Sequence, residues 1–118
     1  MEDQITAYFE ERIAACRTAA TALNTDGRAD EGVFEKIRMN VFDIFRQVYS
    51  ASGRSCGSNE QKRLEFLRKQ LDAIPSTWQT SLEAARNHGD IKKAHIEQIK
   101  LAAAAEIQQK ATEWSGSK

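Results

Sequence analysis

Residues 31–51 read EGVFEKIRMNVFDIFRQVYSA, and their apolar side chains return every three or four positions. That spacing is the period of an α-helix and places these side chains on one face. Phe42 and Tyr49 widen the face beyond what a single neighbouring helix can cover. We therefore expect this helix to lie centrally in the fold and to touch at least two others. The remainder of its apolar stripe consists of Val33, Ile37, Val41, Ile44, Phe45 and Val48.

The same periodicity predicts four further helices, at about residues 4–23, 59–74, 77–87 and 91–114. Pro75 separates the third helix from the fourth, because proline lacks the N–H group that an interior helical position donates. No strand-like alternation of any length occurs. The sequence thus predicts an all-α fold, an up-and-down helical bundle of about five helices in which the first, second and fifth are long.

Helix ends are marked by glycines and by short polar side chains. Gly27 and the pair His88-Gly89 predict helix stops. Asp30 and Asp90 predict N-caps, and Ser58 with Gln61 has the spacing of a capping box. A flexible linker is expected at about 53–58 and a frayed tail at 115–118, within a single domain spanning 1–118.

Composition limits the class of protein. The chain has 118 residues, a 41% hydrophobic share and a formal net charge of zero from 17 basic and 17 acidic residues. Disordered tail proteins usually carry a high net charge, so this balance argues against that class. The first residues are neither basic nor apolar and no apolar run approaches the length of a membrane span. With Cys16 and Cys56 expected as reduced thiols, we predict a cytoplasmic protein.

Charge is unevenly distributed along the chain. Residues 1–35 carry eight acids and three bases, whereas residues 36–71 carry three acids and eight bases. The simpler interpretation is that an acidic helix packs beside basic ones within one molecule. The alternative is that the acidic segment of one chain meets the basic segment of another across a symmetric dimer.

No pattern typical of an enzyme or of a cofactor site is present. The six glycines are too dispersed for a phosphate-binding loop, and His88 and His95 lie on separate predicted helices without metal-ligand spacing. Cys56 has no identifiable general base, and no carboxylate falls centrally within an apolar stripe. We expect a protein that is not an enzyme and that uses no metal and no cofactor.

Arg12 and Arg38 fall inside apolar arcs of the first and second predicted helices. A guanidinium group taken out of water needs an acceptor, so each is expected to pair with a carboxylate or to reach solvent at the stripe edge. The alternative is a pocket between helices in which both arginines bind a small carboxylate or phosphate. That alternative makes the protein a small-anion sensor.

A basic segment supports a nucleic-acid alternative. The helix expected after Gly89 has few side chains that could read base edges, which weakens a helix-turn-helix interpretation. A small nucleic-acid-binding regulator nonetheless remains an alternative function. Its phosphate contacts would come from Arg54, Lys62, Arg63, Arg68 and Lys69.

Phe66 and Trp114 indicate association with another protein. Phe66 points away from the apolar stripe of its own helix, and Trp114 stands at the end of the last helix, where a small monomer has little left to cover it. We therefore expect a non-enzymatic helical interaction module, self-associating as a homo-oligomer or binding a protein partner. The sequence does not identify that partner.

Overall fold

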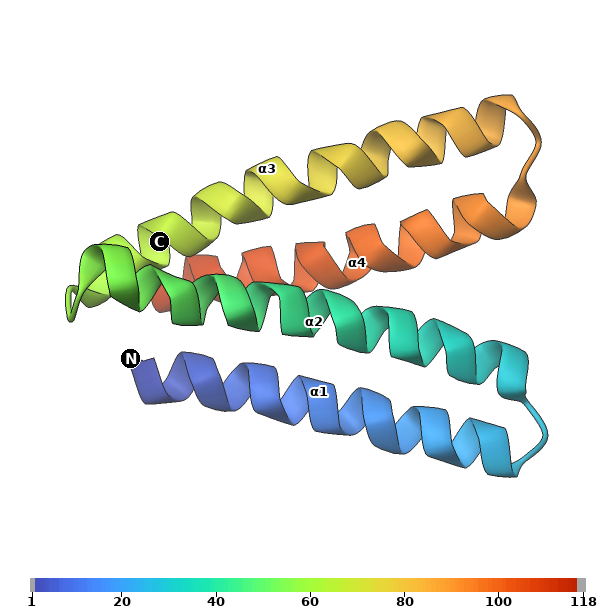
Figure 1. Cartoon of the computed structure of the whole chain (residues 1–118), viewed down its shortest axis with the longest axis horizontal. Coiled ribbons are helices and arrows are strands. Elements are labelled where there is room, and N and C mark those ends of the chain that lie inside the picture. Colours follow the sequence, from blue (N-terminus) through green and yellow to red (C-terminus); the bar gives the residue numbers. More distant parts are fainter. Residues whose placement is uncertain (1, 117–118) are drawn as a thin grey trace.

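The computed structural model describes the backbone of residues 2–116 and the side chains of residues 4–116. Within that range the protein is an up-and-down bundle of helices without strands, joined by three short turns (Figure 1). The helices are α1 (Glu2–Thr25), α2 (Ala29–Cys56), α3 (Glu60–Asn87) and α4 (Ile91–Trp114). The all-α bundle is confirmed, and the number of helices is four.

The predicted break at Pro75 is wrong, because α3 continues through the proline from Glu60 to Asn87. The missing N–H and the ring's clash with the preceding turn together cost roughly 3 kcal/mol in a helix interior. Packing overrides that penalty, since apolar residues recur at helical spacing on both sides of Pro75, from Leu71 to Trp78 and Leu82, facing α4 and the core. Ser76, directly after the proline, donates its hydroxyl to the carbonyl of Ala73.

The predicted linker at 53–58 is also mostly helical, because α2 extends to Cys56. Ser52 is buried, and a side chain added at Gly53 would lie 3.4 Å from the guanidinium group of Arg63. The glycine therefore makes room for an arginine from α3. The next turn is short, and its cap is Asn59, which accepts a hydrogen bond from the Lys62 amide in place of the expected capping box.

Other predicted boundaries hold. Gly27 and Gly89 both adopt positive φ angles, of 74° and 69°, at the two hairpin turns. Asp90 caps α4 by accepting a hydrogen bond from the Lys93 amide at 3.0 Å. Asp30 is not a cap, since α2 begins one residue before it and no side chain caps that end. Ser115 and Gly116 form a turn after α4, and the rest of the predicted tail lies outside the described residues.

The hydrophobic core occupies one end of the bundle. Its members come from the first two-thirds of α1, the second half of α2, the first half of α3 and the second half of α4. All four helices meet at this closed end, where the chain crosses from α2 to α3. The largest fully buried side chains there are Phe9, Phe42, Phe45, Ile5, Leu67, Ile107 and Val41.

The opposite end is open. The α1–α2 hairpin and the α3–α4 hairpin diverge toward their turns (Figure 1). α1 and α2 stay close together at Gly32, where an added Cβ would meet the side-chain oxygen of Asn24 at 2.5 Å. The radius of gyration is 15.6 Å, compared with about 13.5 Å for a compact domain of this length. The open end is therefore part of the shape of the molecule.

α2 is central as expected, packing against each of the other three helices. Its buried face differs from the predicted stripe, however. Phe42, Phe45 and Tyr49 are buried, whereas Val33 is 49% exposed and Ile44 is 37% exposed. α2 is thus rotated so that its aromatic side chains and Val41 face the other helices.

Replacing Pro75 with alanine should stabilise the protein by about 1–3 kcal/mol, because alanine supplies the missing N–H and relieves the ring clash. The free energy of unfolding in urea, measured for wild type and Pro75→Ala, checks this. Lower stability in the variant would show that the helix needs the proline at this position.

Candidate functional site

One face of α2 carries apolar side chains and has no helix covering it. Val33 and Ile44 are its most exposed members, and Ile37 between them is half-buried. The same line along the helix continues through exposed polar and small residues. We refer to this line as the α2 seam, and its residues are Val33, Ile37, Asn40, Ile44, Gln47 and Ala51.

The α2 seam has the spacing of a coiled coil. Successive seam residues are separated by four, three, four, three and four positions, and none of the six carries a charge. A 4-3 repeat of mainly apolar residues is the pattern by which one helix packs along another, knobs into holes. Val33, Ile37 and Ile44 were expected in the core stripe, and the repeat that they form on the uncovered face was not predicted.

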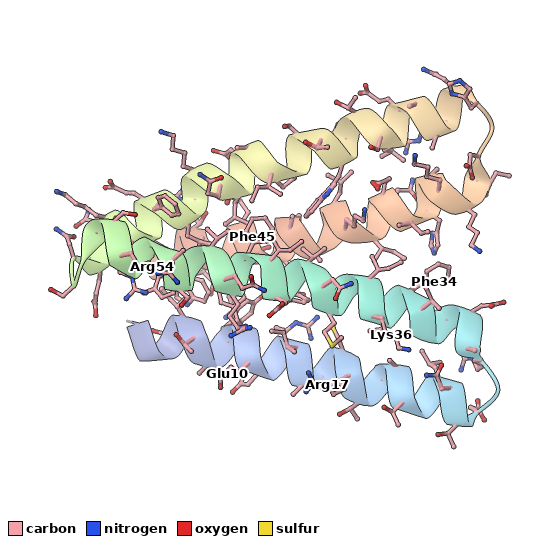
Figure 2. The ribbon with its side chains drawn as sticks, viewed as in Figure 1. Glu10, Arg17, Phe34, Lys36, Phe45 and Arg54 are labelled. Atoms are coloured by element: carbon pink, nitrogen blue, oxygen red, sulfur yellow. The ribbon has the colours of Figure 1, made fainter. Side chains whose placement is uncertain are left out.

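Opposite charges lie beside the seam on its solvent side. Lys36 is exposed on α2 and extends away from the side that carries Phe34 and Phe45 (Figure 2). Asp43, two turns further on, accepts hydrogen bonds from the Arg46 guanidinium at 2.6 Å and from the Gln47 amide at 2.7 Å. The bond from Arg46 lowers the pKa of Asp43, so the carboxylate is ionised at neutral pH.

A hollow of about 420 Å³ adjoins the first turns of the seam, between α2 and α4. Phe34 reaches from α2 toward α4 and meets the ring of His95 edge-to-face, with centroids 4.6 Å apart (Figure 2). Ile91, which is 84% exposed, lines a second hollow at the α3–α4 turn. The first hollow is lined by Asp30, Val33, Phe34, Lys92 and Ile96.

Arg12 pairs with a carboxylate of another helix, as the simpler interpretation expected. Its Nε and Nη2 lie 3.0 Å and 3.2 Å from the two carboxylate oxygens of Glu106 on α4, and its guanidinium group stacks on Phe42. Tyr8 donates its hydroxyl to the same carboxylate. Burial and this hydrogen bond raise the pKa of Tyr8 above its ordinary value.

Arg38 pairs with Glu35 on its own helix rather than joining Arg12 in a pocket. The charges of both arginines act on the buried Cys16 thiol, whose pKa is raised by burial. Each guanidinium group thus already has a carboxylate partner within the chain.

The predicted basic segment is divided by the fold. Arg63 is only 6% exposed: its Nε donates to the Ser52 hydroxyl at 3.1 Å and its Nη2 to the Tyr49 carbonyl at 3.0 Å. Its guanidinium group also stacks on the Tyr49 ring. Arg68 donates to the Ser115 hydroxyl. The remaining members of the segment, Arg54, Lys62 and Lys69, are exposed.

The two predicted interface aromatics are less available than expected. Trp114 is 8% exposed, because the rings of Tyr8 and Phe9 on α1 pack against it edge-to-face. The prediction that a small monomer cannot cover this residue is therefore wrong. Phe66 is half-buried on α3. The exposed apolar residues that sequence reasoning missed are those of the α2 seam and Ile91.

One buried carboxylate was also missed. Glu97 on α4 is 4% exposed, and Lys100 one turn later donates to it at 2.9 Å while lying over the Trp78 ring. The buried face of α4 includes Ile99 and Ala104, and Ala104 lies seven residues after Glu97 on nearly the same line. Lys100 thus pairs with Oε1 of this carboxylate, whereas Oε2 is buried without a hydrogen-bond partner.

The histidines are not part of a larger cluster of ligands. His88 ends α3, and its Nδ1 lies 2.8 Å from the Ala84 carbonyl, as befits a residue at the negative end of a helix. Among the described residues, no three His, Cys, Asp or Glu side chains come together in a group that could hold a metal ion. None of the four helices, as described, combines the length and apolar character needed to cross a membrane.

The chain matches no protein-family model, and no curated protein or solved structure is significantly similar to it.

Replacing Arg63 with alanine should destabilise the protein by about 2–4 kcal/mol, because Ser52 and the Tyr49 carbonyl lose a charged donor inside the bundle. The neighbouring Lys62→Ala is the matched control, since Lys62 is exposed, and it should change stability by less than about 0.5 kcal/mol. Denaturant unfolding measures both. Equal losses of stability in the two variants would show that the hydrogen bonds of Arg63 do not stabilise the bundle.

The stability of the protein should fall as pH rises through about 10, where the unfolded chain's tyrosine ionises. The folded Tyr8 has a raised pKa, so the stability it contributes is complete below pH 10 and is lost progressively above it. In Tyr8→Phe the fall between pH 9 and pH 11 should be shallower. Unfolding free energies of both proteins at these pH values provide the measurement. If wild type and Tyr8→Phe lose stability in parallel, Tyr8 does not cause the fall.

Proposed function

We propose that this protein is a non-enzymatic helical interaction module that binds another protein helix along the α2 seam. The observation that supports it is an uncovered, uncharged stripe with heptad spacing on the helix that already organises the bundle. The three larger apolar side chains Val33, Ile37 and Ile44 share one line along the helix, whereas scattered exposed apolar residues of a monomer need not do so.

Physical considerations favour a partner on this face. The buried side of α2 is filled by Phe42, Phe45 and Tyr49, so a partner can occupy the opposite side without disturbing the core. Covering Val33 and Ile44 removes apolar surface from water, worth about 25 cal/mol per Å². The adjoining hollow between α2 and α4 offers further apolar contact at Phe34 and Ile96.

The other functions expected from the sequence have less support. In the anion-sensor alternative, Arg12 and Arg38 would have to leave Glu106 and Glu35. A nucleic-acid contact would rely on the exposed members of the basic segment without Arg63. The cytoplasmic location and the absence of a cofactor stay predictions from the sequence.

A photo-crosslinking amino acid placed at position 44 tests the proposal in intact cells. We expect a discrete protein adduct from position 44 and none from position 17, where Arg17 is exposed on a different helix, α1. Ile37→Asp in the same protein should abolish the adduct, because a carboxylate in the seam must be desolvated on binding.

Adducts at position 44 no stronger than those at position 17 would contradict the proposed function. The mass of a specific adduct also identifies the partner, which is either a second copy of this chain or a different protein.

A further inference from the structure

We propose that the helix bound along the α2 seam is α2 of a second copy of this chain, packed antiparallel about a twofold axis beside residues 38 and 39. This inference rests on the proposed function and names its partner. Three independent features of α2 support it: the order of the seam residues, the charges beside the seam and the polar residues at its ends.

The spacing of the seam is the same in both directions. From Val33 to Ile44 the steps are four, three and four, so an antiparallel copy meets the seam in register. Val33 of each copy then lies against Ile44 of the other, and these are the two most exposed apolar residues of α2. Ile37 of each copy lies against Asn40 of the other, which forms the two central layers.

The charges beside the seam are complementary in this register and only in this direction. Measured along the helix axis, Lys36 of one copy and Asp43 of the other are offset by about 3 Å. The twofold axis generates a second, equivalent pair. A parallel arrangement would separate the level of Lys36 from that of Asp43 by seven residues, about 10 Å along the helix axis, and would leave the pair unformed. The charge pair therefore favours antiparallel packing.

The ends of the seam also agree with this register. Asp30 lies one heptad before Ile37, at the level of Gln47 of the other copy. An amide can donate to a carboxylate there, so each outer layer is polar where solvent is near. Antiparallel packing also places the acidic first turn of α2 opposite the more basic second half of the other α2. The sequence had raised such pairing of acidic and basic segments between chains as an alternative.

The contact is limited to the few layers of one helix face, so we expect a weak dimer with a dissociation constant on the order of 10 μM. Sedimentation at protein concentrations from about 1 μM to about 1 mM should show conversion of monomer to dimer.

Disulfide trapping tests the direction and the register. Val33→Cys and Ile44→Cys are made separately in a Cys56→Ser background, which leaves Cys16 buried. Mixing the two proteins under oxidising conditions should give a disulfide between positions 33 and 44 of different copies, whereas each variant alone should give little. Circular dichroism verifies that both remain helical.

Charge reversal tests the flanking pairs. Lys36→Glu should weaken the dimer about threefold to tenfold, because it faces Asp43 of the other copy, and Lys36→Glu with Asp43→Lys should restore it. Lys69→Glu, which reverses an exposed lysine on α3 away from the seam, is the matched control and should leave dimerisation unchanged.

Three results would overturn the inference. Ile44→Cys could form a disulfide with itself without mixing, which indicates a parallel pair, or the Lys36→Glu, Asp43→Lys double variant could fail to regain dimerisation. The third is that sedimentation shows a monomer at every concentration. If the protein is monomeric but position 44 still crosslinks to a different protein, the proposed function stands and only the second copy is excluded. If neither contact forms, both proposals fail.

Discussion

The aromatic cluster at the closed end is the interaction on which the rest of the structure depends. Phe9 and Tyr8 of α1, Phe42 of α2 and Trp114 of α4 contact one another edge-to-face, with centroids 5.3–6.3 Å apart. These side-chain contacts join the two hairpins, although the backbones of α1 and α4 have few close approaches. Edge-to-face pairs add about 0.5–1.5 kcal/mol each beyond the area that they bury. The cluster therefore ties the first hairpin to α4 at the closed end.

The burial of the aromatic side chains of α2 explains why the seam is exposed. Burying Phe42, Phe45 and Tyr49 turns α2 so that Val33 and Ile44 point away from the core. At the other end α1 and α2 stay close together at Gly32, which supplies no side chain to hold the hairpins together. The unused face of α2 is thus a consequence of how the core is filled.

Periodicity, caps and positive-φ glycines were sufficient to predict the fold class, three of the helices and most of the turns. Pro75 was misread because local propensity was given more weight than the continuous stripe from Leu71 to Leu82, which continues across it. Burial of Arg63 and Glu97 could not be predicted from one helix alone, since each depends on partners that the fold supplies. The orientation of α2 was ambiguous for a similar reason, because its apolar residues cover two adjoining faces and only the packed neighbours decide between them.

The contact of Trp114 with Tyr8 and Phe9 has a consequence for how the bundle forms. The two sides of this contact are more than one hundred residues apart, so forming it closes a very long loop, with an entropic cost that grows slowly with loop length. During synthesis, the first hairpin emerges with its aromatic rings still exposed to water. The ring of Trp114 can cover this hairpin only after the ribosome has synthesised that residue. Until then the hairpin is the species most accessible to chaperones and most prone to premature association.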